Sequence, residues 1–433
     1  MSALTSSRPS PAQRPSYAAV LRVPHARRTF LAALAARLSY GTVSLAVLLS
    51  VTRATGSYAV SGLVMALFGG TMVVLLPVRA TLVDRYGPRR ALPPLAAVYS
   101  VLLCLLAALT WRPGAPPAVL AAAAALTGCV APPLGPTMRA VWGRLVDDPG
   151  LLRRAYSLDG VAEELLFVSG PALVGLLLRF GPPPAGLLLS AVLMLAGTCV
   201  FVMSPAVRGV VPPKREKGRA PGRFPAAPVV AAAGLGLALS AADLLVMAFA
   251  EQRSYGDGVV PWVLAALSAG SAVGGLLNGA VEWRRPAGER LAWLSVGLGA
   301  VLVAAGFAPG LWTLAGAMAL AGAFVAPTLT TAYLLADETA AEEERTRAGA
   351  WVNAAVNAGT SGGSVVAGVL VGSVPLWVCF ALSGGVAVVA AVGVRTVSRL
   401  PLGGVWSRPR GGSRTSDTAP RLCGAPRQAA DKT

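Results

Sequence analysis

Three carboxylates lie close together in an otherwise apolar stretch, "YSLDGVAEELLF" at residues 156–167. Asp159 and Glu163 are four residues apart, so they share one face of a helix, and Glu164 lies about 100° further round. Burial disfavours the ionised form of a carboxylate, and neighbouring carboxylates repel each other. Groups of this kind bind and release protons. The cluster therefore predicts proton coupling, with Glu163 as the first candidate and Asp159 and Glu164 as its partners.

Other polar side chains interrupt the apolar stretches of the chain. Asp243 is a fourth acidic candidate for proton coupling, and Arg37 is a candidate counter-charge for the carboxylates. The alternative is a structural ion pair between Arg37 and a carboxylate. The amides of Asn353 and Asn357 lie four residues apart in an apolar stretch and should face something polar, which predicts a path for a small solute. Trp351 could line the same path, and the alternative for Trp351 is packing. The predicted pathway residues are Arg37, Tyr40, Trp351, Asn353 and Asn357.

The composition identifies the elements that must position these residues. Hydrophobic residues make up 55% of the 433 residues and charged residues 13%, whereas soluble domains carry about 25% charged residues. A chain of this composition cannot cover the polar surfaces of soluble domains. We therefore predict an all-α integral membrane protein.

Twelve apolar runs are long enough to span a bilayer, whose core takes about 20 residues of helix. Residues 1–29 are too long and too polar for a signal peptide. The fourth run contains "APPLGP", and proline is tolerated in a spanning helix. The predicted spans are 30–52, 58–78, 91–111, 117–143, 156–178, 185–204, 228–250, 259–281, 290–308, 311–336, 348–372 and 375–395.

The distribution of basic residues predicts the orientation of these spans. With the N-terminus in the cytoplasm, only four of the 37 Lys and Arg residues fall in the outer loops, at Arg53, Arg112, Arg179 and Arg253. Basic residues collect on the cytoplasmic side of membrane proteins. We therefore predict a multi-pass protein of the plasma membrane with both termini in the cytoplasm.

The longest internal gap is basic and rich in Pro and Gly, and it divides the spans six and six. The net charge of +18 is spread over such gaps, which disfavours nucleic acid as a partner. The predicted partners are the lipid bilayer, a small molecule and protons, and the predicted state is a monomer. The predicted parts are an N-terminal tail (1–29), a six-helix half (30–204), a cytoplasmic linker (205–227), a second six-helix half (228–396) and a disordered basic tail (397–433).

Several classes of chemistry have no matching residues. The single histidine is His25, and the five cysteines are scattered as small packing residues, so we predict neither a metal site nor a disulfide framework. The chain has no Gly-x-Ser-x-Gly motif and no phosphate-binding GxxxxGK[ST] loop. We therefore predict no cofactor, no enzymatic activity and no ATP-driven transport by this chain alone.

An internal repeat supports the division into halves. The segment "CVAPPLGPTMR" at 129–139 resembles "FVAPTLTTAYL" at 324–334, and residues 153–175 run parallel to 345–368. Two consecutive matched segments at similar spacing are hard to obtain by chance. Repeated halves of this kind are typical of transporters whose pathway lies at the interface of the repeats.

The turn after the second span, "TLVDRYGPRR" at 81–90, carries four charges. It resembles the signature of the major facilitator superfamily, Gly-x-Leu-x-Asp-Arg-x-Gly-basic-basic. Ala80 replaces the first glycine and Pro88 the first basic residue. The resemblance in helix number, linker and repeat extends over the whole chain up to the tail. The matching residues are Leu82, Asp84, Arg85, Gly87 and Arg89, with Arg90 supplying a further basic residue.

The resemblance implies that this turn gates the cytoplasmic side. Asp84 lies near the end of a helix, where a carboxylate can receive the positive N-terminus of a neighbouring helix. Arg85 can partly compensate Asp84, and Arg89 and Arg90 can bond the last carbonyls of adjacent helices. The alternative is a positively charged anchor with an incidental Asp. The counterpart in the second half, at 278–290, keeps the charge types without the spacing.

The fifth span carries "SGPALVG", which matches part of the superfamily's drug-antiporter signature at Gly170, Pro171 and Gly175. Small residues let helices approach closely and proline lets them bend, and the alternative is ordinary tight packing. The match favours export. The efflux signature also requires an Arg early in the fourth span, which is missing here. Arg139 is predicted to lie near the cytoplasmic end, too late to replace it.

These observations predict a secondary transporter, a proton-coupled exporter of a small molecule that works by alternating access. The alternatives are an importer or uniporter of the same fold, and a membrane sensor or scaffold that does not transport. The carboxylates within the membrane and the signature charges present in the 81–90 turn favour transport over the sensor.

Overall fold

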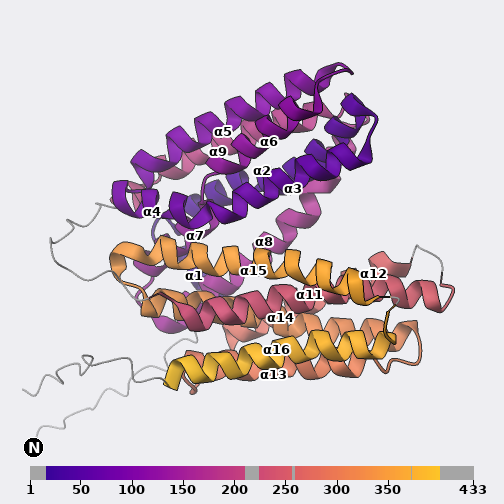
Figure 1. Ribbon diagram of the computed structural model, residues 1–433. Helices are drawn as coiled ribbons and strands as arrows, with labels where there is room; N and C mark the ends of the chain where they lie inside the picture. The colour runs from indigo at the N-terminus through magenta and orange to yellow at the C-terminus, as the bar shows by residue number, and fades with distance from the viewer. Residues whose placement is uncertain (1–15, 210–223, 256–258, 372, 400–433) are drawn as a thin grey trace, which may run out of the picture. The chain divides into compact units, whose positions relative to one another are not determined.

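The computed structural model describes residues 16–209, 224–255, 259–371 and 373–399 (Figure 1). The predicted N-terminal tail up to residue 15, most of the linker and the tail after residue 399 lie outside these ranges. The described chain is helical apart from one isolated β-bridge between Val371 and Val374. The helices of the first half are α1 (Tyr17–Arg22), α2 (Ala26–Thr55), α3 (Tyr58–Val74), α4 (Leu76–Tyr86), α5 (Pro88–Trp111), α6 (Pro117–Val130), α7 (Leu134–Leu145), α8 (Pro149–Leu177), α9 (Pro184–Met203) and α10 (Pro205–Arg208).

The described residues of the second half form six long helices and the short 3₁₀ turn η2 (Glu342–Glu344). Proline stands in the first turn of several helices of both halves, where its missing N–H needs no partner. The elements are α11 (Ala226–Gln252), α12 (Val260–Ala280), α13 (Ala287–Ala305), α14 (Leu311–Thr339), η2 (Glu342–Glu344), α15 (Arg345–Leu370) and α16 (Leu376–Arg399).

Ten helices or joined helices of the described chain are long and apolar enough to cross a membrane, and α3 with α4 forms an eleventh, broken span. The segment α15 is as long as these but carries Asn353, Asn357, Thr360 and Ser361, so its hydropathy does not distinguish it as a span. Together with α15, these elements correspond one to one with the twelve predicted spans.

Two predicted spans are interrupted. The pair α3 and α4 bends by 42°, and Pro77 stands in the first turn of α4. The predicted span 117–143 is not one helix, because α6 ends at Val130 and α7 begins at Leu134. Consecutive prolines at 132 and 133 remove two backbone donors. The helices α2 and α8 also begin earlier than predicted, at Ala26 and Pro149.

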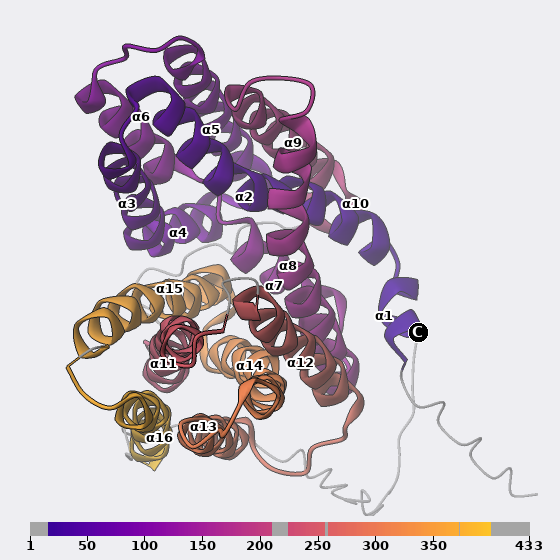
Figure 2. The same cartoon turned by 90° about the vertical axis from the view of Figure 1, so that its right-hand side faces the viewer.

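Figure 1 shows α2–α9 gathered in one bundle and α11–α16 in another. One buried apolar cluster contains Tyr99 and Trp142 of the first bundle and continues into the second bundle through residues such as Val352. A separate cluster, with Phe249 and Phe380, lies within the second bundle. Contacts between the bundles come from α8, which packs on α12 and α14, and from α15, which packs on α4 and α7. Figure 2 shows α8 and α12 side by side.

The repeated segments lie at corresponding places in the two bundles. Residues 153–175 belong to α8 and 345–368 to α15, and each packs on the first long helix of its own half. A Cβ on Gly170 would lie 2.2 Å from the carbonyl carbon of Gly41 in α2, and one on Gly363 would lie 2.3 Å from the carbonyl oxygen of Leu237 in α11. In both halves the small residues therefore permit backbone-to-backbone packing of equivalent helices.

Candidate functional site: a four-charge cluster and a junction between the halves

Two arginines and two carboxylates form a closed cluster inside the first half. Nη1 of Arg37 in α2 donates to Oδ1 of Asp159 in α8 at 2.7 Å, and Nη2 of Arg37 lies 2.8 Å from Oε2 of Glu163. On the other side, Nε of Arg139 in α7 lies 3.1 Å from Oδ2 of Asp159, and its Nη2 donates to Oε2 of Glu163. Each charge therefore has two partners of opposite sign, and the cluster is neutral when both carboxylates are ionised.

The four side chains differ in their access to water. Asp159 has 0% of its side-chain surface exposed, Arg37 has 2% and Arg139 has 4%, whereas Glu163 has 24%. Buried charges are stable only when paired and hydrogen-bonded. This explains why the three buried members, Arg37, Arg139 and Asp159, lie next to charges of opposite sign. Glu163 is the most exposed member of the cluster.

Arg139 completes the cluster, although the sequence did not point to it as a coupling residue. The sequence predicted only that Arg139 lies near the cytoplasmic end of the fourth span, and the structure buries it against Asp159 and Glu163. Its guanidinium carbon also lies 3.7 Å from the ring centroid of Tyr333 in α14, a cation–π contact between the two halves. The break before α7 and the early start of α8 place Arg139 beside the carboxylates. The signal in the sequence was an arginine inside an apolar run.

Two other predicted coupling residues lie outside the cluster. Glu164 accepts a hydrogen bond at Oε1 from Ser271 in α12, so it joins the two halves directly. Asp243 in α11 is exposed, and in the described part of the chain it has no ion-pair partner.

Tyr40 and Arg79 satisfy carbonyls at the two helix breaks. The Tyr40 hydroxyl donates to the carbonyl of Pro132, in the gap between α6 and α7. Arg79 of α4 donates from Nη1 to the Gly128 carbonyl at 2.7 Å and from Nη2 to the Met72 carbonyl. A buried backbone group without a partner is costly. These side chains therefore stabilise the broken helices that surround the cluster, a role that was not predicted for Arg79.

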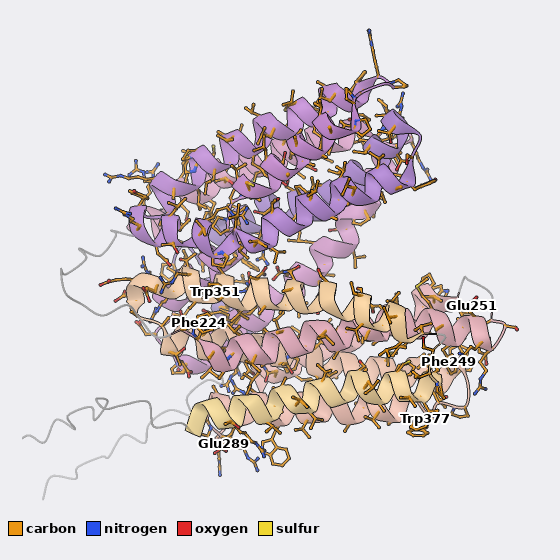
Figure 3. All side chains as sticks on the ribbon, in the orientation of Figure 1. Phe224, Phe249, Glu251, Glu289, Trp351 and Trp377 are labelled. Carbon is orange, nitrogen blue, oxygen red and sulfur yellow. The ribbon has the colours of Figure 1, made fainter. Side chains whose placement is uncertain are left out.

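The predicted pathway residues of α15 divide between two faces of the helix. Asn353 donates to the Tyr333 hydroxyl at 3.2 Å, and Asn357 donates to the carbonyl of Asn353 at 2.8 Å, so this face lies beside the cluster. Trp351 packs edge-on against Phe224 at 5.3 Å between ring centroids (Figure 3). Two residues are about 200° of helical turn, so Trp351 and Asn353 lie on different faces of α15, which favours the packing alternative for Trp351.

Asp84 connects the two halves through backbone hydrogen bonds. Its Oδ1 accepts from the amide of Thr346 at 3.2 Å and its Oδ2 from the amide of Arg347 at 2.8 Å. Both amides belong to the first turn of α15, where the helix dipole is positive. We call this contact the Asp84 junction, and the ends of the helices near it the Asp84 end.

The other residues of the 81–90 turn have different surroundings. Arg85, Arg89 and Arg90 are exposed, and Arg85 lies over the ring of Tyr86 at 5.3 Å. None of the three has a salt bridge within the described ranges, so the predicted compensation of Asp84 by Arg85 is not observed. Gly87 has a φ of 80° between α4 and α5, a conformation that glycine adopts without strain.

A second contact strengthens the Asp84 end. Nε of Arg345 lies 3.4 Å from Oδ1 of Asp337 in α14, and its Nη1 donates to the carbonyl of Gly143 in α7 at 3.2 Å. A Cβ on Gly143 would lie 3.0 Å from Oδ2 of Asp337. The C-terminus of α7 is therefore held against α14 and α15 of the other half.

The equivalent turn of the second half makes a different contact. Glu282 is exposed there and receives no helix N-terminus in the described structure. Instead, Nη2 of Arg154 in α8 donates to the carbonyl of Ala280 at 3.3 Å, and the Tyr17 hydroxyl of α1 donates to the carbonyl of Leu276. Side chains of the first half thus bond to α12 where the second half has lost the carboxylate spacing.

The three signature residues of α8 have separate roles. Gly170 allows the close contact with Gly41, and Pro171 lies inside the helix. Gly175 has no atom within 4 Å of its would-be Cβ, so packing does not require glycine there. Among the described residues, no group of three or more His, Cys, Asp or Glu side chains could hold a metal ion.

Comparison with known proteins identifies the family. The sequence matches the model of the Major Facilitator Superfamily over residues 29–310 and 227–423. The chain belongs to this superfamily. It is accordingly a multi-pass membrane protein with the superfamily fold and a secondary transporter rather than an enzyme, which confirms the predicted fold class. A search of curated proteins finds no match.

Solved structures with 14–17% identity show the same fold. A bacterial homologue of the iron transporter ferroportin, in an outward-facing state with soaked iron, has 17% identity and a TM-score of 0.66, over 86% of this chain and 97% of that one. The human organic anion transporter MFSD10 (TETRAN) has 14% identity and a TM-score of 0.66, over 88% and 100%. The E. coli fucose:proton symporter FucP (N162A) has 14% identity and a TM-score of 0.61, over 87% and 99%.

Proposed function

We propose that this protein is a proton-coupled exporter of a small molecule, and that Glu163 carries the proton. The observation that supports the proposal is the difference in exposure within the four-charge cluster. Glu163 has 24% of its side-chain surface exposed, while its partners Arg37 and Arg139 have 2% and 4%. A coupling residue must be stable when ionised and reachable when it is protonated, and Glu163 alone in the cluster meets both conditions.

The pairing explains how protonation changes the site. With Glu163 ionised, two carboxylates balance two guanidinium groups. Protonation of Glu163 leaves one positive charge in excess and weakens the ion pair with Arg139. Because the Arg139 guanidinium also lies on the ring of Tyr333 in the other half, the change acts at the contact between the halves. A solute bound at this contact between the halves would meet the same charged groups, and it could compete with the proton for them.

Alternating access requires the halves to separate at one end at a time. The backbone bonds from α15 to Asp84 and the Arg345–Gly143 bond hold the Asp84 end closed in this structure. The bias of basic residues assigns the Asp84 end and both termini to the cytoplasm. We infer that Glu163 binds a proton from the outer side, and that opening of the Asp84 junction then releases it inside while the substrate leaves outward.

Two observations support this proposal over a sensor or scaffold. Gly170 and Pro171 match part of the export signature, and Gly170 is required for the contact between α8 and α2. Among the proteins of similar fold, one is titled an organic anion transporter and another a proton symporter. Proton coupling and the movement of small organic molecules are therefore both compatible with this fold.

The test uses purified protein in liposomes, with a substrate selected by comparing the resistance of cells with and without the protein across a compound panel. Substrate addition should drive proton movement through the wild type in the opposite direction. Glu163→Gln should abolish the proton flux, since the amide cannot be ionised. Glu251→Gln is the matched control, because Glu251 is exposed at the end of α11. Unchanged proton flux and stoichiometry in Glu163→Gln would exclude it as the carrier and make Asp243 the next candidate. Co-directional fluxes would indicate import.

A further inference from the structure

A groove of about 770 Å³ lies on the surface of the first half, between the α1–α2 connection and the C-terminal part of α9. Small residues from the two helices form its floor. Gly197 allows α9 to approach α2 closely, because a Cβ there would lie 2.4 Å from the amide nitrogen of Ala36. The floor residues are Ala32, Ala35, Ala196 and Gly197.

The groove opens onto a surface that faces lipid. Leu31 and Val200 line it and are 54% and 44% exposed. Further along α9, Val192 and Leu195 are 63% and 41% exposed. Large apolar side chains on the outside of a membrane helix contact acyl chains. An occupant of the groove therefore has an apolar part that continues into the bilayer.

The mouth of the groove is strongly basic. Arg22, His25, Arg27 and Arg28 line it, and all four are exposed. Within the described ranges no ion pair includes any of these residues. The chain has no Asp or Glu before Asp84 and none within α9. These positive charges consequently have no counter-charge among the residues that line the groove.

The backbone at the mouth also favours an anion. His25 has a φ of 65°, and its carbonyl accepts from the Thr29 hydroxyl at 2.8 Å and from the Thr29 amide at 3.1 Å. This turn exposes the first turn of α2, where the amides of Arg27 and Arg28 have no acceptor among the described hydrogen bonds. The N-terminus of a helix carries a partial positive charge that attracts anions.

We propose that this groove binds an anionic phospholipid. Its phosphate lies among Arg22, Arg27 and Arg28 at the mouth, and one acyl chain lies along the alanine floor between α2 and α9. The basic mouth and the apolar floor are complementary to the two parts of one lipid molecule, whereas a free phosphate would leave the floor empty. The predicted cytoplasmic position agrees, since that leaflet attracts basic segments through its anionic lipids.

The test is isothermal titration calorimetry of the full-length protein in detergent. The ligands are dioctanoyl phosphatidylglycerol, dioctanoyl phosphatidylcholine and glycerol 3-phosphate. The wild type should bind the phosphatidylglycerol about tenfold more tightly than either comparator, because its charge and its chains both contribute. The variant Arg27→Gln/Arg28→Gln should lose about 25-fold in affinity for phosphatidylglycerol and keep its weak affinity for phosphatidylcholine.

Two further variants separate charge from groove. Arg85→Gln/Arg89→Gln removes two exposed arginines elsewhere and should leave binding unchanged. Ala35→Phe fills the floor and should weaken the binding of both lipids without a change in charge. It also provides a second test of the groove if the double arginine variant does not fold. Equal affinity for the two lipids, equally tight binding of glycerol 3-phosphate, or equal losses in the two double variants would overturn the proposal.

Discussion

The four-charge cluster and the Asp84 junction both contain carboxylates at least partly shielded from solvent, but the hydrogen-bonding and charged partners of these carboxylates differ. Asp159 and Glu163 are paired with arginines of their own half, whereas the described hydrogen bonds to the Asp84 carboxylate come from backbone amides of the other half. The cluster can therefore persist while the halves move, and the junction cannot. On this difference rests our proposal that the first region binds the proton and the second stabilises the closed state.

The strongest test of the comparison removes one charge from the cluster. Arg37→Gln leaves Asp159 without its 2.7 Å partner, and removal of one member of a buried ion pair costs about 3–5 kcal/mol. We expect a marked fall in thermal stability, measured by tryptophan fluorescence in detergent. The double variant Arg37→Gln/Asp159→Asn restores neutrality and should recover part of the loss. A double variant as unstable as the single one would show that charge balance does not hold the cluster together.

A smaller effect on stability but a large effect on transport is expected at the junction. Asp84→Asn replaces one acceptor oxygen by an NH₂ group that faces the first turn of α15, and hydrogen bonds to charged groups contribute about 1.5–3 kcal/mol. Transport should fall about tenfold while the protein still inserts and folds, as shown by its elution and yield. Glu282→Gln is the matched control in the other half, where the carboxylate is exposed. Equal transport by both variants would make the turn only an anchor.

The smallest effect is expected where the two regions connect. Tyr333→Leu removes the ring beneath Arg139 and a cation–π contact of about 0.5–2 kcal/mol, while Tyr333→Phe keeps the ring and loses only the bond from Asn353. The pH at half-maximal transport should shift in Tyr333→Leu and stay close to the wild-type value in Tyr333→Phe. Identical pH profiles for the two variants would show that the ring of Tyr333 does not couple the cluster to the second half.

Hydropathy and the distribution of basic residues were sufficient to predict the number and order of the spans. They could not predict that 117–143 breaks at the two prolines, because apolar composition is the same on both sides of the break. For Asp84, the type of residue and its place at a helix end predicted the partner correctly, since a helix N-terminus needs a nearby anion.

The cluster was predicted in part. Spacing brought Asp159 and Glu163 to one face, and depth suggested Arg37, which lies 2.8 Å from Glu163. The contact of Arg139 with the carboxylates was not predicted, because it depends on the helix break. For Trp351 the choice between path and packing stayed open, because the helical period alone does not say which face of α15 meets the other half. Long-range pairings of this kind, including Tyr333 over Arg139, are set by tertiary packing and leave no local pattern.

We expect protonation of Glu163 to open the Asp84 junction. The most direct measurement is a distance distribution by pulsed electron paramagnetic resonance between spin labels on Arg89→Cys and Glu342→Cys, two exposed positions on either side of the junction, with the native cysteines replaced by serine. Lowering the pH should move the wild-type protein toward longer distances, and Glu163→Gln should show the longer distances at every pH. A Glu163→Gln protein that still changes its distances with pH as the wild type does would contradict the account.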